Sequence, residues 1–111
     1  ALHYLGRAIG IKPSFARARM VSARILESIG ELALATELMY QIPEVHPHYA
    51  VGILQTAIWA YEHGDTAIAL ELYKRAYADL KPFEKSQFES HPIVKQIAEE
   101  QKSTILLNVL Q

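Results

Sequence analysis

The stretch GDTAIALELYKRAYADLKP, residues 64–82, holds the features that decide the fold. Its apolar and small residues recur at steps of three and four, which places them on one face of an α-helix. They are Ala69, Leu72, Tyr73, Ala76, Tyr77 and Leu80. Gly64 can end a preceding helix in a left-handed turn, and Asp65 can cap the new helix. We therefore expect a helix that follows a tight turn and ends before Pro82.

The same features recur along the chain at one constant interval, which runs from Ala1 to Ala35 and again from Ala35 to Ala69. We call this interval the repeat period. Other positions that match at the same interval are Leu5, Met39 and Tyr73; Pro13 and Pro47; Ala23 and Ala57; and Gly30 and Gly64, with Pro82 one residue late. Agreement among several residue classes on one period indicates an internal repeat. Each unit is expected to be a helix, a tight turn, a second helix and a prolyl loop, with no strand.

The alanines have a direct physical role in such a unit. Two antiparallel helices can approach closely only where their side chains are small, and Ala23 with Ala35, like Ala57 with Ala69, is placed for that crossing. One hairpin cannot cover its own apolar face, so neighbouring hairpins are expected to stack.

Together these residues resemble the tetratricopeptide repeat, a helix-turn-helix unit of the same length. Residues 64–82 look like the second half of a unit, with Ala57 and Trp59 in the helix before it. Residues 16–49 look like another unit, and ALHYLGRAIGIKP at the start looks like the second helix of a truncated third. The resemblance implies an all-α, right-handed solenoid of hairpins over residues 1–82, divided into residues 1–15, 16–49 and 50–82.

The chain departs from the family pattern in two respects. Arg19 and Ile53 stand where an aromatic residue often begins the first helix, and Ile42 replaces a small residue. Because Pro43 follows, we expect that helix to end near Gln41, with QIPEVHPHY as a longer link.

In tetratricopeptide arrays the first helix of each unit lines a concave groove, so the resemblance implies a partner-binding site. Its residues would be Arg17, Met20, Arg24 and Glu27 from one unit and Val51, Leu54, Ile58, Tyr61 and Glu62 from the next. Charged residues are all basic within residues 1–26 and all acidic within residues 27–73, so the groove would have a basic end and an apolar floor. A peptide or helix with an acidic end and apolar anchors would complement it.

Two other interpretations of the same residues stay open. The charges can simply solvate exposed helix faces, and the apolar floor can be covered by the chain's own next helix. The groove does not resemble the carboxylate clamp of chaperone-binding modules, which uses asparagines with lysines, because the only asparagine is Asn108.

After Pro82 the register fails, because a further repeat would place Pro92 inside its first helix. Ser90 is expected to cap a new helix with Pro92 in its first turn. Residues 83–111 are then helices that cap the last repeat, or a contact surface for a partner or a second copy, and the two roles are compatible. The contact surface would consist of Ile105, Leu106, Val109 and Leu110.

Motifs for catalysis are missing from the sequence. It has no Gly-rich phosphate loop, nucleophile elbow or metalloprotease helix, and no cysteine for a disulfide or a thiolate metal site. His46 and His48 are the nearest approach to a metal-ligand pair, but such spacing is common by chance and only Glu44 lies close in sequence. His63 precedes Gly64 at a helix end, where a cation suits the helix dipole. We therefore predict neither an enzyme nor a cofactor or metal site.

Bulk properties narrow the partner classes further. A net charge of −1 with 21% charged residues argues against disorder and against a polyanion-binding tail. The longest stretch without Asp, Glu, Lys or Arg, residues 45–61, is too short and too polar to span a membrane. The first residues lack the layout of a signal peptide, and because the chain enters a repeat midway we interpret it as part of a longer protein. The compartment stays open, with the cytoplasm favoured.

The leading prediction is a non-catalytic scaffold that binds a peptide or helix of a partner protein. The resemblance implies a place in a multiprotein assembly, such as a bacterial secretion or envelope-assembly system, although a fold alone does not choose among such roles. The alternative is an architectural module that docks to another domain or forms a homodimer. Single-stranded RNA is a third class of partner, which the acidic run over residues 27–71 opposes.

Overall fold

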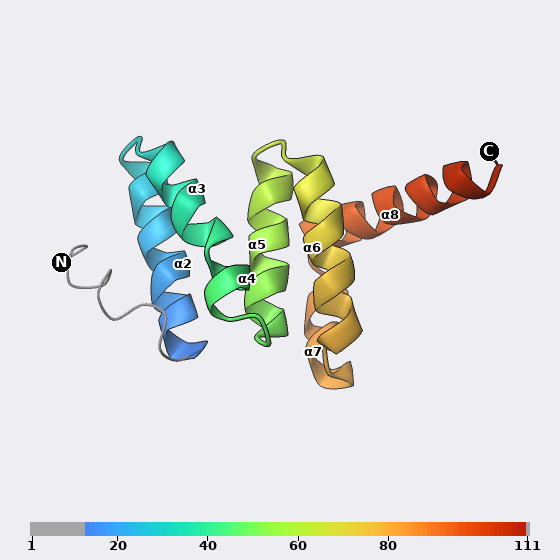
Figure 1. The fold of residues 1–111 in the computed structure, drawn as a ribbon, viewed down its shortest axis with the longest axis horizontal. Coiled ribbons are helices and arrows are strands. Elements are labelled where there is room, and N and C mark those ends of the chain that lie inside the picture. Colours follow the sequence, from blue (N-terminus) through green and yellow to red (C-terminus); the bar gives the residue numbers. More distant parts are fainter. Residues whose placement is uncertain (1–12, 111) are drawn as a thin grey trace.

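The computed structural model describes residues 13–110, so the second helix expected within residues 1–15 lies largely outside the described part of the chain. The helices are α2 (Pro13–Ser28), α3 (Leu32–Tyr40), α4 (Ile42–Val45), α5 (Ala50–Glu62), α6 (Thr66–Asp79), α7 (Pro82–Phe88) and α8 (Pro92–Leu110) (Figure 1). No strand occurs among residues 13–110, and the predicted all-α class is confirmed.

Helices α2 and α3 pack together as one hairpin, and α5 and α6 pack together as a second (Figure 1). The four alanines expected at the crossings, Ala23, Ala35, Ala57 and Ala69, are all fully buried. Their small side chains allow the paired helices to approach closely. Helices α3 and α4 also contact α5, which joins the two hairpins.

The two hairpins turn in the same way, one repeat period apart. Gly30 has a φ of 88° and Gly64 a φ of 86°, the left-handed conformation that glycine adopts most readily. In each turn the amide after the glycine donates at 2.8 Å to a carbonyl in the last turn of the preceding helix, from Glu31 to Leu26 and from Asp65 to Ala60. This bond belongs to the Schellman motif, which satisfies carbonyl groups at a helix end.

Asp65 does not cap α6 with its side chain. The carboxylate makes no hydrogen bond to an α6 amide and instead accepts one from the Tyr40 hydroxyl at 2.6 Å. A tertiary contact between the hairpins has taken the place of the predicted local cap.

His91, rather than Ser90, caps α8. Its Nδ1 accepts a hydrogen bond from the Ile93 amide at 3.1 Å, which satisfies one of the free amides at the start of the helix. Because Pro92 occupies the first helical position, the cap falls on the residue directly before it.

The link between the hairpins contains a short helix. Helix α3 ends at Tyr40, next to the expected end at Gln41, but the following residues form α4 instead of a wholly irregular link. Pro43 fits in the first turn of α4, where a backbone amide would have no helical partner.

A close approach between this link and α5 depends on Gly52. A Cβ atom at that position would lie 2.6 Å from Cδ2 of Tyr49 and 3.1 Å from Cγ2 of Ile42. Any larger residue would therefore push the link away from the second hairpin.

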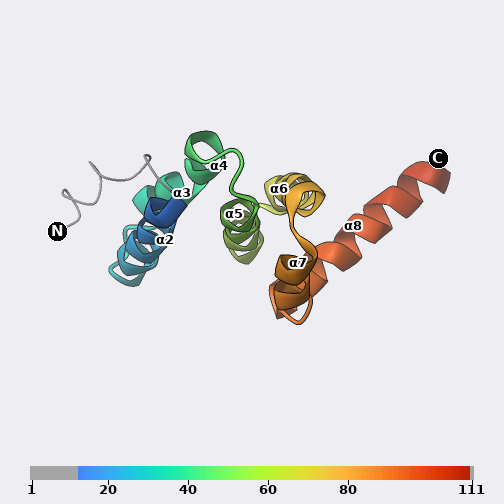
Figure 2. The ribbon, with the colours of Figure 1, turned by 90° about the horizontal axis from the view of Figure 1, so that it is seen from below.

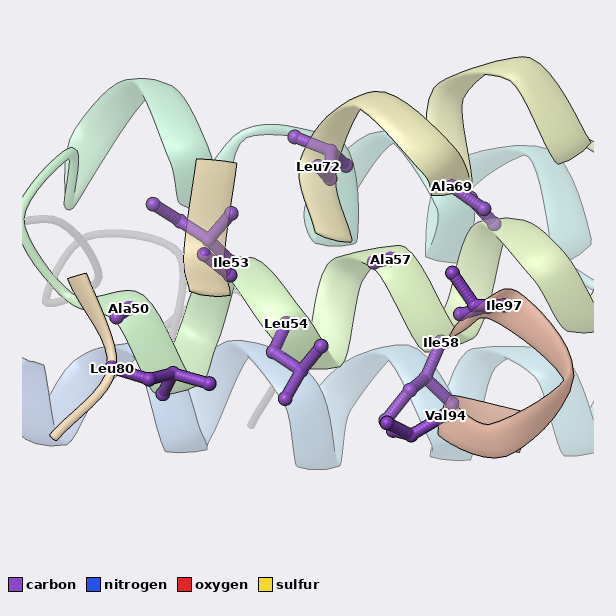
Figure 3. Close-up of a cluster of buried hydrophobic side chains, with 12 residues drawn as sticks. Ala50, Ile53, Leu54, Ala57, Ile58, Ala69, Leu72, Leu80, Val94 and Ile97 are labelled. Atoms are coloured by element: carbon purple, nitrogen blue, oxygen red, sulfur yellow. The ribbon is translucent and has the colours of Figure 1, made fainter. Parts of the chain in front are cut away.

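The apolar core consists of two clusters that meet at α5. The first cluster is Ala16, Ala23, Leu26, Ala35, Met39, Ile42 and Trp59. The second lies between α5, α6 and α8, and Figure 3 shows most of its members, among them Leu54, Ile58, Val94 and Ile97. Trp59 is fully buried and projects from α5 into the first cluster, so the two hairpins share apolar packing as well as a backbone link.

The two halves of the last helix, α8, have different surroundings. The first half of α8 packs on α5 and α6 through Val94 and Ile97, which are buried. The rest of α8 projects away from the hairpins in both ribbon views (Figures 1 and 2). Residues 102–110 are exposed along that projecting half.

Candidate protein-interaction surface

The nine residues predicted to line a groove lie on α2 and α5, and the structure divides them into groups. On α2, Arg17 is exposed and Met20 is half-buried. On α5, Leu54 and Ile58 are buried, while Val51 and Tyr61 are half-buried against the second cluster. The remaining three residues, Arg24, Glu27 and Glu62, form a polar network. The predicted site is therefore not one continuous open groove.

Leu54 and Ile58 do not form an open floor, which corrects the prediction for these two residues. Leu54 is 0% exposed and Ile58 is 3% exposed, and both belong to the cluster that contains Val94 and Ile97 of α8 (Figure 3). The apolar stripe of α8 packs on α5 and α6, which removes its surface from water and is therefore favourable. Both residues are buried among side chains of the same chain, from α6 as well as from α8.

Arg24 carries the predicted basic end, but its charge is already paired. One guanidinium nitrogen lies 2.8 Å from Oε1 of Glu62 and the other lies 3.2 Å from Oε1 of Glu27. The guanidinium carbon also lies 4.7 Å from the centre of the Trp59 ring, within the range of a cation–π contact. Arg24 therefore joins α2 to α5, and Arg17 is a second exposed cation among the predicted groove residues.

His63 extends this polar network at the end of α5. Its Nδ1 lies 2.7 Å from the Trp59 carbonyl oxygen, and its Nε2 lies 2.6 Å from Oε2 of Glu27. The two ring nitrogens thus connect the end of α5 to the Glu27 carboxylate of α2. The ring also stacks on Trp59 with 4.3 Å between centroids.

Two basic side chains, those of His63 and Arg24, lie within hydrogen-bond distance of the Glu27 carboxylate. The contact with His63 and then that with Arg24 lower the pKa of its carboxyl group below the ordinary value, against an opposing effect of desolvation. Glu27 consequently connects the two hairpins, and its carboxylate oxygens are already bound by side chains of the same chain.

An open apolar hollow lies on α2 beside these residues. It has a volume of ≈ 390 Å³ and is lined by Met20, Val21, Arg24, Ile25 and Ser28. Two of the predicted groove residues, Met20 and Arg24, thus contribute to a concave surface. Arg17, one turn before Val21 on the same helix, adds an exposed positive charge nearby.

The groove prediction missed the exposed apolar residues that line this hollow or lie beside it. Val21, Ile25 and Ile29 are 53%, 47% and 64% exposed, an unusual degree for large aliphatic side chains that share one helix face. Their regular helical spacing is visible in the sequence, but an apolar face at that spacing ordinarily indicates a core, so the pattern alone does not reveal exposure.

The end of α8 forms a second exposed apolar surface. The predicted interface residues Ile105, Leu106, Val109 and Leu110 are between 54% and 75% exposed, and Leu107, which the prediction omitted, is exposed as well. Within residues 105–110 every residue except Asn108 is apolar, so this part of the helix has no polar face to present to water.

The histidines and acidic residues bring together no metal site in the part of the chain that the structure describes. His46 is buried, and burial followed by the charge of Arg19 lowers the pKa of its imidazole. His48 is exposed beside it. Among residues 13–110 no helix is long and apolar enough to cross a membrane.

Comparison of the chain with protein-family models, with curated proteins and with solved structures finds no match. We therefore infer function from the hollow of α2, the polar network beside it and the exposed end of α8.

Proposed function

We propose that this chain is a tetratricopeptide-like module, a right-handed stack of helical hairpins that binds a partner protein without catalysis. The observation that carries the proposal is the apolar hollow on α2, because a concave apolar surface beside an exposed cation suits recognition of a peptide. The support for the family is the repeat period, which appears in the two hairpins as matching turns and matching buried alanines.

The partner is a peptide or an amphipathic helix with apolar anchors and an acidic end. Met20, Val21 and Ile25 offer aliphatic surface to the anchors, and Arg17 lies at the edge for a carboxylate. No acidic residue occurs within residues 1–26, so an approaching carboxylate meets no repulsion from α2 before Glu27.

A binding experiment with matched variants tests this function. The full chain, Arg17→Glu and Met20→Asp are used to capture partners from cells of the source organism, and affinities for the captured partner are then measured with purified proteins. Lys102→Glu is the control, because it makes the same charge change as Arg17→Glu on the exposed end of α8. Arg24 is left unchanged, since its loss would also break the network with Glu62 and Glu27.

The expected result is that both α2 variants weaken binding by about tenfold or more, equivalent to roughly 1.4 kcal/mol, while Lys102→Glu binds like the original chain. Circular dichroism should show unchanged helix content for all variants. Equal affinity of the three variants would place the partner elsewhere and contradict the hollow as its site.

A second candidate function is self-association through the end of α8, favoured by the exposure of Leu106 and Leu110. Sedimentation over a range of concentrations tests it. A dimer that Leu106→Asp converts to a monomer would establish this role, and a monomer at the highest concentration would exclude it.

A further inference from the structure

The hollow of α2 has the layout that receives one side chain of a neighbouring helix. Four of its lining residues surround one point of the helix surface within about two turns: Val21, Arg24, Ile25 and Ser28. When two helices pack side by side, a projecting side chain of one inserts into a hole formed by four residues of the other. Arg24 contributes its aliphatic stem, because its guanidinium group is bound by Glu62. The hollow therefore suits an apolar side chain on a docked helix.

The projecting half of α8 carries such side chains on one face. The members of this face are exposed and recur at steps of four, three and four residues: Glu99, Ser103, Leu106 and Leu110. The exposed face of α2 follows the same steps, through Arg17, Val21, Arg24 and Ser28. Alternating steps of three and four are the spacing with which two helices pack along their length. The two faces therefore match in register over about three turns.

Charge sets the direction in which α8 lies on α2. In a parallel arrangement Leu106 enters the hollow while Glu99, about two turns earlier, meets Arg17. In an antiparallel arrangement with Leu106 in the same place, Glu99 meets Glu31 and is repelled. The contact between Glu99 and Lys102 is 3.8 Å long and largely exposed, so it competes only weakly with the new ion pair. The charges therefore favour the parallel arrangement.

The α8 that docks belongs to another copy of the chain. In both ribbon views the projecting half of α8 points away from α2, and the second hairpin lies between them (Figures 1 and 2). We propose that the projecting half of α8 docks in parallel on α2 of the next copy, with Leu106 in the hollow and Glu99 beside Arg17. This inference rests on the proposed function, because it names the occupant of the same protein-binding hollow.

A second copy supplies an apolar surface of the kind that the hollow binds. Large aliphatic side chains are exposed at both ends of the molecule, on α2 and on α8. One contact between copies removes both surfaces from water. Because the contact joins unlike surfaces, each pair keeps one open hollow and one undocked α8. Assembly therefore continues head to tail.

Sedimentation of two complementary variants tests the proposal. Ile25→Asp places a charge in the hollow and Leu106→Asp places one on the docking face; these residues are 47% and 61% exposed, so neither change disturbs the core. The original chain should form oligomers whose mass rises with concentration, and each variant alone should associate about tenfold more weakly or less. An equimolar mixture should regain the original affinity but stop at a dimer, because the intact α8 of one variant docks on the intact hollow of the other.

Phe83→Asp is the control for these changes. Phe83 is a large exposed apolar residue on α7, outside both surfaces, so this variant should associate like the original chain. A symmetric contact between two α8 ends predicts a different pattern, in which Ile25→Asp associates normally and mixing restores nothing. That pattern overturns the proposal, and so does an original chain that stays monomeric at every concentration.

Reversal of charge tests the direction of docking. Arg17→Glu should weaken association, and Glu99→Arg added to the same chain should restore it, because the ion pair re-forms with its signs exchanged. Failure of the second change to restore association overturns the parallel arrangement.

The combined results separate this inference from the proposed function. If the original chain stays monomeric while Arg17→Glu still weakens capture of another protein, the hollow binds that protein and only this inference fails. If the hollow variants change neither self-association nor capture of a partner, both fail.

Discussion

Nε2 of His63 lies 2.6 Å from Oε2 of Glu27, although the two residues are far apart in sequence and belong to different hairpins. The pair connects the last turn of α2 to the end of α5. Arg24 contacts the other oxygen of Glu27 and also Glu62, so two basic side chains and two carboxylates alternate across the contact between the hairpins. Such an arrangement holds the orientation of the hairpins more firmly than a single exposed ion pair.

The first prediction is that this network makes stability depend on Glu27 in acid. Its folded pKa lies below the ordinary value of 4.5, so its contribution is present above that value and is lost as pH falls through the lower folded pKa. The free energy of unfolding, measured with urea at several pH values, should fall less steeply below about pH 4.5 for Glu27→Gln than for the original chain.

Glu99→Gln is the control for the acid experiment. Glu99 lies 3.8 Å from Lys102 with both side chains largely exposed, so its replacement should leave the slope unchanged. Identical slopes for the original chain and Glu27→Gln would show that the Glu27 contacts do not stabilise the fold.

The second prediction concerns the two turns. Because Gly30 and Gly64 have positive φ and open space around them, alanine at either position would cost about 1–2 kcal/mol through backbone strain alone. Asparagine tolerates this conformation better, so Gly30→Asn should cost less than Gly30→Ala. Chemical denaturation measures both, and equal stability of the original chain and Gly30→Ala would contradict the strain.

The third prediction concerns crowding at Gly52. Gly52→Ala should destabilise the fold by about 1–3 kcal/mol, because its Cβ would overlap the Tyr49 ring. Relief of the clash by Tyr49→Ala in the same chain distinguishes this cause from a loss of helix propensity, which alanine would in fact improve. If the losses of unfolding free energy caused by Gly52→Ala and Tyr49→Ala simply add in the double variant, measured with urea, the overlap is ruled out.

The fourth prediction is that Arg19→Ile keeps or raises stability. Arg19 is 5% exposed, and burial lowers the pKa of its guanidinium. Its Nη1 donates to the Gln41 side chain and, at 3.5 Å, to the Leu38 carbonyl, while Nε has no partner. A buried charge without a carboxylate is costly, and apolar replacement is often neutral or stabilising by about 1–4 kcal/mol.

Isoleucine is the matched choice for that test, because Ile53 occupies the position one repeat period later and is buried there. Arg19→Ala serves as the comparison, since it removes the charge but leaves a cavity and should be less stable than Arg19→Ile. A large loss of stability in Arg19→Ile would mean that the polar contacts of Arg19 outweigh its desolvation. Urea denaturation ranks the three chains.

Local pattern was sufficient to predict the hairpins. The glycine period placed both turns, and the alanine period placed the helix crossings, because backbone conformation and steric size act within a short stretch of sequence. Even the end of α3 was predictable within one residue, since Pro43 limits how far a helix can continue.

The candidate site was less predictable, because exposure depends on which distant helix arrives. Leu54 and Val21 are both apolar residues on first helices, yet Leu54 is buried in the cluster that includes Val94 and Ile97 of α8, while Val21 remains exposed. Asp65 illustrates the same limit, since Tyr40 reached its carboxylate from the other hairpin. Nothing in the local sequence of either residue encodes the identity of its neighbour.

Trp59 is the only tryptophan in the chain, and it lies where the hairpins meet, beneath Arg24 and against His63. Its fluorescence should therefore respond to any change in the contact between the hairpins. The projecting end of α8 contains no tryptophan, so its unwinding or binding would leave the tryptophan fluorescence unchanged. The molecule thus carries a natural optical probe that separates events between its hairpins from events at its C-terminal end.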